Sequence, residues 1–270
     1  MFTERFNALN KEGQFTKQML GSGATQIRKA NYATKGIYFQ AFTSLSTGLE
    51  RIGKLCLMLD HYGDHNGNFQ SSKSVRDIGH NIGDIYAKCI SIIAKRSFRF
   101  EFLQNLDDPL HQAVLTVLSE FAEGDRYSNI NLLVSDKRQK DPIASWAKLV
   151  DQPLYDICIS QSKKDGIRSR SQMANVLFGQ NAMVLHTSEV GTEVSDFEEA
   201  SYMTGVYEAV APYRQMYVLQ IIRFWVELLT SLQYELMRGP TQDIPFFSEV
   251  FAVFYNDDSY FRTRKTWENV

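Results

Sequence analysis

Arg76 and His80 are the two residues whose types and spacing first indicate chemistry, within the segment KSVRDIGH at residues 73–80. They stand four apart, and side chains with that spacing share one face of an α-helix. An imidazole beside a guanidinium stays neutral near physiological pH and can then act as a general base. Arg76 and His80 are therefore the candidate catalytic residues. A hydrogen-bonded histidine on the flank of a helix would give the same pattern without any chemistry.

Further polar residues of both signs stand close to this pair in the sequence or in the helix expected before it. This supporting polar cluster consists of Glu50, Lys54, Lys73, Asp77 and Asn81. A short antiparallel turn would bring the end of the first helix beside the start of the second, so we expect these groups to converge. The alternative for Glu50 and Lys54 is a surface ion pair at i,i+4, worth only a few tenths of a kcal/mol.

Apolar residues recur at steps of three and four along most of the chain, which predicts an all-α bundle of five to eight helices. We expect one long helix over about 24–60, a turn-rich break over 61–68, and a second helix over 73–95 that packs antiparallel to the first. The segment 207–237 is apolar nearly all round, which predicts a second long helix at the centre of the bundle. No linker divides residues 1–270, so a single domain is expected.

Shorter elements follow from local signals. Asp108 followed by Pro109 predicts a helix start, and that helix should end near Gly124. Another helix is expected after Asp141-Pro142, and a short one over 247–254. The stretch 161–172 is interpreted as an exposed basic loop. Its candidate nucleic-acid contacts are Lys163, Lys164, Arg168 and Arg170, although basic loops are more often simply solvated.

Composition narrows the classes of function. The 270 residues carry 29 Lys+Arg against 31 Asp+Glu, a net charge of -2, which argues against a protein that coats nucleic acid over a broad basic face. The three cysteines are far apart and form no CxxC pair, so we expect free thiols, a cytoplasmic location, no metal and no other cofactor. No apolar leader opens the chain, and charged residues interrupt its most apolar stretch, so no membrane span is expected.

The segments LERIGKLCLMLDHY and SVRDIGHNIGDIYAK, separated by a Gly/Asn-rich loop, resemble the HEPN superfamily. The resemblance covers about 24–123, which would be a HEPN-like core, with 124–270 as a helical extension. It implies a metal-independent endoribonuclease of a prokaryotic defence or toxin–antitoxin system, acting as a homodimer. His80 would move a proton at the ribose 2′-hydroxyl or the leaving 5′-oxygen, and Arg76 would hold the phosphate. The spacing from Arg76 to His80 is one residue shorter than the family pattern.

Two other functions fit the sequence. One is a catalytically inactive all-α module, from the same kind of system, that binds nucleic acid or a cognate partner protein. The other is a carboxylate-bridged di-metal site in a helical bundle, for which Asp77, His80, Asp108 and His111 are the nearest approach to the required Glu-x-x-His pairs. A capping role explains Asp108 better than a metal ligand does.

Overall fold

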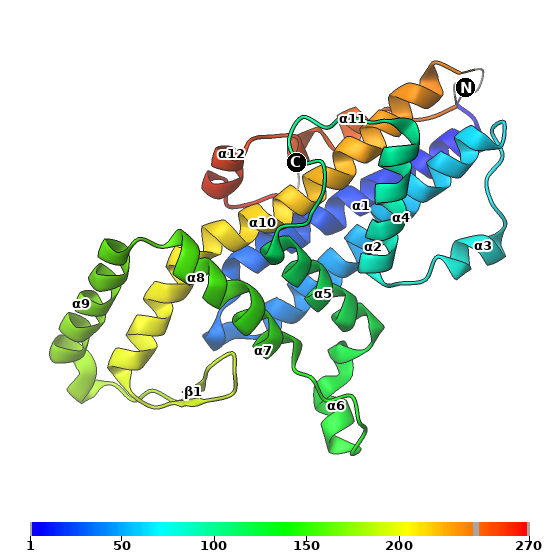
Figure 1. The fold of residues 1–270 in the computed structure, drawn as a ribbon. Helices are drawn as coiled ribbons and strands as arrows, with labels where there is room; N and C mark the ends of the chain where they lie inside the picture. The colour runs from blue at the N-terminus through cyan, green and yellow to red at the C-terminus, as the bar shows by residue number, and fades with distance from the viewer. Residues whose placement is uncertain (1, 240–242, 269–270) are drawn as a thin grey trace.

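The computed structural model of the chain describes residues 2–239 and 243–268. These residues are predominantly α-helical with one short β-hairpin, which confirms the predicted all-α bundle, although they form more α-helices than the five to eight expected (Figure 1). The elements are α1 (Glu4–Lys29), α2 (Gly36–Asp64), α3 (Ser72–Asp77), α4 (Ile82–Arg96), α5 (Pro109–Glu123), α6 (Ser128–Leu133), α7 (Pro142–Trp146), α8 (Gln152–Cys158), α9 (Gln161–Phe178), β1 (His186–Thr187), β2 (Glu193–Val194), α10 (Phe197–Met237), α11 (Phe247–Val250) and α12 (Asp258–Thr263).

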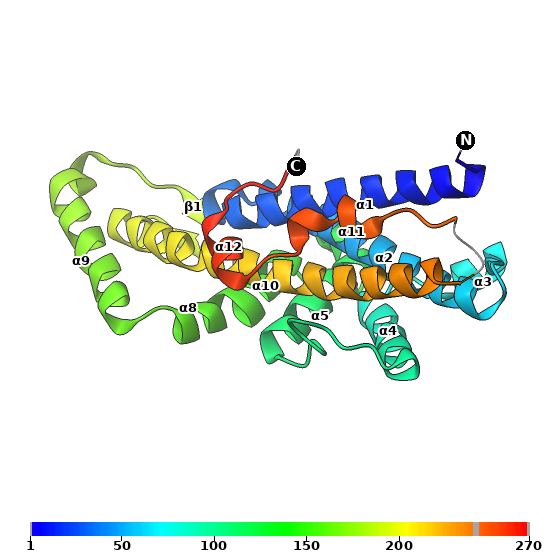
Figure 2. The ribbon, with the colours of Figure 1, turned by 90° about the horizontal axis from the view of Figure 1, so that it is seen from above.

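Three long helices, α1, α2 and α10, form the body of the molecule and lie side by side in both views (Figures 1 and 2). Most of α10 is buried, which confirms the predicted central position of the last long helix. It begins earlier than predicted, at Phe197, where the Asp196 side chain accepts the Glu199 N–H at 2.8 Å and caps the first turn. Its N-terminal part extends beyond the ends of α1 and α2 and carries α9 there (Figure 2).

Helices α1 and α2 approach each other closely through a reciprocal pair of glycines. A Cβ added to Gly48 of α2 would stand 2.7 Å from the side chain of Leu20 in α1. A Cβ added to Gly23 of α1 would stand 2.6 Å from the side chain of Leu45 in α2. Each leucine therefore occupies the space that a side chain on the facing helix would need, which fixes the register of this antiparallel pair.

The predicted single helix over 24–60 is wrong, because the chain breaks between α1 and α2. Ala30 adopts an extended conformation, and the Asn31 side chain accepts the N–H groups of Ala33 and Thr34 at 2.9 and 3.1 Å. Such local bonding by Asn competes with helical bonding and starts a new turn. The antiparallel partner of α2 is therefore α1. Helix α4, from the predicted partner 73–95, does pack against α2, but both helices run in the same direction, as the contacts Glu50–His80 and Asp60–Lys95 show.

The predicted helix over 73–95 is also divided, into α3 and α4. Gly79 has a φ of +84°, in the left-handed region that favours glycine. Asn81 then caps α4, since its side chain accepts the Asp84 N–H at 3.0 Å. The apolar stripe predicted over this region therefore belongs to two short elements that meet at a sharp turn.

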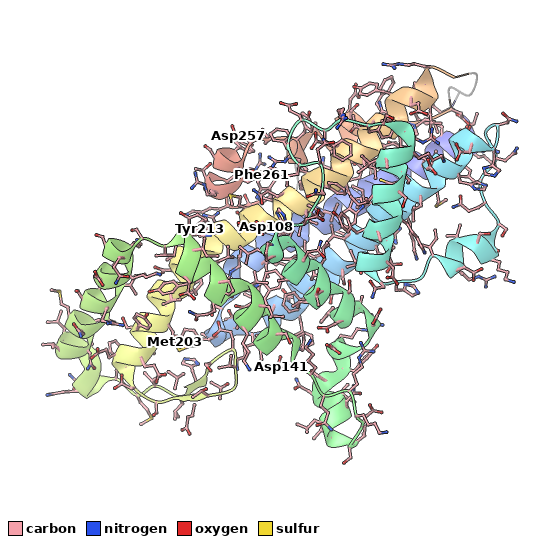
Figure 3. The ribbon with its side chains drawn as sticks, viewed as in Figure 1. Asp108, Asp141, Met203, Tyr213, Asp257 and Phe261 are labelled. Atoms are coloured by element: carbon pink, nitrogen blue, oxygen red, sulfur yellow. The ribbon has the colours of Figure 1, made fainter. Side chains whose placement is uncertain are left out.

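Several local predictions are confirmed. Asp108 caps α5 with Pro109 in its first turn, and the helix ends at Gly124. Asp141 caps α7, and the chain stays helical through a π-helical turn into α8 (Figure 3 labels both aspartates). The stretch 161–172, in contrast, is not a loop: it lies inside α9, where Ser160 provides the cap.

Residues from both 24–123 and 124–270 contribute to one buried hydrophobic core, together with residues of α1 that precede both segments. Trp225 of α10 lies within it, beside Gly53 of α2 and the ring of Tyr86 in α4. Within the described part of the chain, no helix combines the length and the apolar character that a membrane crossing needs.

The glycine contacts predict opposite effects for two Gly→Ala substitutions. Gly48→Ala should destabilise the protein by about 1–2 kcal/mol, because overpacking against the buried Leu20 exceeds the gain in helix propensity. Gly166→Ala in α9, where a Cβ meets nothing within 4 Å, should stabilise by up to about 1 kcal/mol. Urea unfolding followed by far-UV circular dichroism measures both. Equal effects of the two substitutions would contradict the close approach of α1 and α2.

Candidate functional site

Part of the predicted polar cluster does converge. Glu50 of α2 accepts a hydrogen bond from Lys54 Nζ at 2.7 Å, and its same oxygen lies 3.0 Å from His80 Nδ1. The His80 side chain is 73% exposed. With Nδ1 donating to the carboxylate, Nε2 is the ring nitrogen left to accept a proton. The arrangement is a surface carboxylate–histidine pair beside a lysine, and such a pair can carry out proton transfer.

Arg76 is not on the same helix as His80, so the prediction of a shared helical face is wrong. Arg76 belongs to α3, where its Nε donates to the Ser72 carbonyl at 3.3 Å, whereas His80 stands after the turn at Gly79. A left-handed glycine between two residues abolishes the i,i+4 relation on which the prediction depended. Lys73 and Asp77 are also on α3, outside the contacts of the Glu50–His80 pair.

Asn81 has a structural role in place of the predicted supporting one. Its side-chain oxygen caps α4, and its Nδ2 donates to Glu123 Oε1 of α5 at 2.6 Å. These two bonds engage the amide group at both ends, so Asn81 fixes the start of α4 against the end of α5. That placement in turn sets the position of His80, the preceding residue.

The predicted nucleic-acid contacts are on α9. Lys163, Arg168 and Arg170 are exposed, whereas Lys164 is half-buried, donates to the Asp156 carbonyl at 3.2 Å and lies 5.0 Å from the centre of the Tyr155 ring. Helix α9 and helix α3 lie at opposite ends of the molecule (Figure 1). The structure therefore does not bring these cations together with Arg76.

A buried charge network was not predicted. Arg214 of α10 is 1% exposed, and its Nη2 lies 3.2 Å from Asp151 Oδ2. Arg214 Nη1 also donates to the Ala30 carbonyl at 2.9 Å and to the Tyr38 hydroxyl at 3.2 Å. The guanidinium thereby satisfies the end of α1, where a helix leaves carbonyl groups unpaired. These residues are distant in sequence, and no local pattern pairs them.

The π-helical turn at Ala147–Asp151 explains how Asp151 reaches this network. A π turn joins residues five apart, and the Trp146 Nε1 donates to Asp151 Oδ1 at 3.0 Å. Burial raises the pKa of Asp151 to about 6, and the charge of Arg214 opposes that rise. Asp151 and Arg214 line a cavity of about 420 Å³ with Tyr155 and Tyr202, whose hydroxyls are 3.2 Å apart.

A second unpredicted feature is a set of exposed apolar side chains on the C-terminal half of α9 and just after it. We call it the α9 patch, and its members are Met173, Val176, Leu177, Phe178, Met183 and Leu185. Met173, Val176 and Leu177 have the spacing of one helical face, a signal in the sequence that our prediction did not use. Which face is buried depends on the neighbouring helix, so the sequence pattern alone did not show that this one is left uncovered.

The di-metal alternative gains no support from the geometry. Among the described residues, no three His, Cys, Asp or Glu side chains come close enough together to hold a metal ion. Asp108 caps α5, and the buried His111 lies with its Nε2 2.8 Å from Gln220 Oε1. Burial lowers the pKa of His111, which keeps the ring neutral in this hydrogen bond.

No family model, curated protein or solved structure matches this chain. What the chain does is therefore inferred from its own residues and their contacts.

Arg214→Met should destabilise the protein by about 3–5 kcal/mol at about pH 8, because the Asp151 carboxylate is then buried without a cation. Removing the guanidinium also raises the pKa of Asp151 further. As the pH falls below about 6, Asp151 becomes protonated in both proteins, so the difference in stability should shrink. Urea unfolding across this pH range measures it, with the exposed Arg238→Met as the control. A loss that does not change with pH would assign the effect to packing and not to charge.

Proposed function

We propose that the chain is an all-α interaction module that binds a partner protein through the α9 patch. The observation that carries this proposal is the exposure of large apolar side chains in one short region. Val176 is 82% exposed and Met183 is 88% exposed, although the body of the molecule encloses a large hydrophobic core. Apolar patches of this kind mark protein-interaction sites in soluble proteins, because covering them releases water from apolar surface.

The way α9 packs supports this interpretation. Its buried residues are Ile167 and Ser171, and Ile167 fits against Gly205 of α10, where a Cβ would stand only 2.6 Å away. Only this face of α9 is covered. Met173, Val176 and Leu177 follow one another at helical spacing on an uncovered part of its surface, so a partner can contact them without any rearrangement of the bundle.

Charge indicates the chemistry of the partner. The exposed cations Lys163, Arg168 and Arg170 precede the α9 patch on the same helix. A complementary surface would carry apolar residues beside carboxylates. The homodimer that the HEPN resemblance implies is a poorer occupant, because a second α9 patch has no carboxylate to pair with these cations. A cognate partner protein, also implied by that resemblance, fits the patch better.

A display library of protein fragments from the source organism can be screened for segments that bind this chain. That screen tests the proposal. The selected segments should be acidic and apolar, and Leu177→Glu should weaken their binding by about 30-fold or more, the loss typical of an interface hot spot. Leu133→Glu is the matched control, since Leu133 is an exposed apolar residue on α6, outside the α9 patch.

Equal weakening by both substitutions, or selection of no segment at all, would contradict the proposal. Light scattering on the purified chain separates the homodimer from the partner complex. A dimer that Leu177→Glu dissociates would assign the α9 patch to self-association, which overturns the proposal of a different partner.

A second candidate function is the metal-independent endoribonuclease, which the Glu50–His80 contact favours. A carboxylate that holds Nδ1 orients the ring and stabilises the imidazolium that forms on proton uptake. His80 Nε2 would take the proton of a ribose 2′-hydroxyl. The 2′-oxygen then attacks the adjacent phosphorus as the bond to the 5′-oxygen breaks. The 5′-oxygen takes up a proton from water, and the His80 imidazolium returns its proton to water. Lys54, bonded to the same carboxylate, is the nearest cation to this pair in the hydrogen-bond network.

Cleavage of single-stranded RNA in the presence of EDTA tests this function. His80→Ala should reduce the rate by about 100-fold or more, the usual contribution of a general base, and Glu50→Gln should reduce it by a smaller factor. His65→Ala is the control, because His65 is exposed and stacks on His61 away from Glu50. Activity that His80→Ala leaves intact, or activity that EDTA abolishes, would remove this mechanism.

A further inference from the structure

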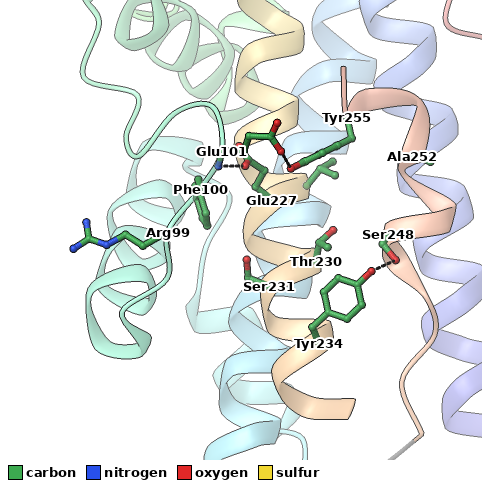
Figure 4. Close-up of a pocket in the computed structure, with 11 residues that line it drawn as sticks. Arg99, Phe100, Glu101, Glu227, Thr230, Ser231, Tyr234, Ser248, Ala252 and Tyr255 are labelled. Atoms are coloured by element: carbon green, nitrogen blue, oxygen red, sulfur yellow. Dashed lines mark hydrogen bonds between the residues drawn. The ribbon is translucent and has the colours of Figure 1, made fainter. Parts of the chain in front are cut away.

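A cavity of about 570 Å³ opens between α10, the segment 99–101 and the chain around α11 (Figure 4). Its floor includes Glu227 of α10, and its sides include Glu101, Tyr234 and Tyr255. The volume lies within the range of small-molecule sites. None of the residues discussed for partner or RNA binding lines it.

Two carboxylates face this cavity from different elements. Glu227 is 5% exposed, and its Oε1 accepts the backbone N–H of Glu101 at 2.7 Å. Its Oε2 is buried and has no hydrogen-bond partner among the described residues. Burial raises the pKa of Glu227, which reflects how incompletely its charge is compensated. Glu101 is exposed at the rim, and one of its oxygens accepts the Tyr255 hydroxyl (Figure 4).

Both tyrosine hydroxyls on the cavity wall already have acceptors. The Tyr255 hydroxyl donates to Glu101, and the Tyr234 hydroxyl donates to Ser248 Oγ at 3.5 Å. The Arg99 side chain extends away from the other lining residues (Figure 4). The hydroxyls of Thr230 and Ser231 also line the cavity, and each can accept as well as donate. The two carboxylates can only accept when ionised, so the ligand that fits them best brings donors of its own.

The nearby buried cation Arg223 compensates Glu227 only in part, because burial raises the pKa of Glu227 and the charge of Arg223 lowers it by a smaller amount. Arg223 Nη2 pairs with Asp258 Oδ1 at 3.0 Å, and its guanidinium lies 3.8 Å from the centre of the Phe102 ring. Both interactions hold the Arg223 head group outside the lining of the cavity. The carboxylate of Glu101 therefore has only the Tyr255 hydroxyl as a partner in the described structure.

Aromatic rings complete the lining. Phe100 is half-buried, and Tyr234 and Tyr255 are exposed. Ring faces attract organic cations, and more strongly where the cation loses water. A hydrated metal ion would gain little here, because it requires several oxygen ligands in one shell and the wall is largely aromatic and aliphatic. Aliphatic amines, with N–H donors on an apolar carbon chain, match both the carboxylates and the rings.

We propose that this cavity binds a small aliphatic polyamine, with one ammonium group at Glu101 and Glu227 and the carbon chain against the tyrosine rings. The site is separate from the α9 patch and from the Glu50–His80 pair. A bound polyamine would connect α10, the segment after α4 and the chain around α11, three elements that meet at this cavity (Figure 4).

Isothermal titration of the full chain with spermidine at near-physiological salt tests this site. Glu101→Gln should weaken binding by about 10-fold or more, because it removes an exposed rim charge without disturbing the core. Tyr255→Phe should weaken it less, since the ring remains. Glu208→Gln is the matched control, as Glu208 is an exposed carboxylate of α10 outside the cavity. Glu227→Gln should abolish binding if circular dichroism shows that the variant folds.

Absence of binding by the wild-type chain would overturn the proposal. Equal weakening by Glu101→Gln and Glu208→Gln would also overturn it, because the attraction would then be to the general surface charge. If Glu227→Gln does not fold, Glu101→Gln and Tyr255→Phe still decide the outcome. Displacement of spermidine by magnesium at equal ionic strength would indicate a divalent-cation site and contradict the polyamine assignment.

Discussion

The structure depends on buried polar side chains of α10 that bind the backbone of the segments around it. A helix satisfies its own backbone groups, but a loop or helix end packed against it does not. Arg214 donates to the end of α1, and Gln215 donates to the Ala24 carbonyl at 2.8 Å. Arg223 donates to the Asn256 carbonyl at 2.6 Å, and Glu227 accepts the Glu101 N–H. These contacts attach α1, the segment around Asn256 and the segment around Glu101 to the central helix.

This arrangement explains why a nearly all-apolar helix retains so many polar residues. Gln233, near the other end of α10, accepts the Ser248 N–H at 2.8 Å and so positions α11. A buried polar group without a partner costs free energy, and so does an unpaired backbone group. A hydrogen bond between a buried polar side chain and an unpaired backbone group removes both free-energy costs. Helix α10 can therefore be buried at the centre and still carry polar residues at defined positions. The same pairing places a carboxylate at the floor of the cavity beside α11.

Much of the fold could be predicted from local signals, and the failures have identifiable causes. Asp108 with Pro109 specified the start of α5 because capping depends on neighbouring residues only. The breaks at Asn31 and Gly79 were missed because the apolar stripe continues on both sides of each. Glu50 was correctly expected near His80, whereas Arg76 was wrongly placed, since one left-handed glycine changes the direction of every residue after it. The Arg214–Asp151 pair and the uncovered face of α9 depend on tertiary neighbours that no local pattern specifies.

Because Leu20 fits on Gly48 and Leu45 fits on Gly23, the α1–α2 hairpin can pack in one register only. A slip of one helical turn would set Leu20 against Ser44 or Ile52, which leaves either a void or a collision. The connection at residues 30–35 therefore does not need to determine the register of α1 and α2, because contacts between the two helices determine it. Its sequence is free to serve another purpose, and in this molecule it supplies the carbonyl group of Ala30 that receives Arg214.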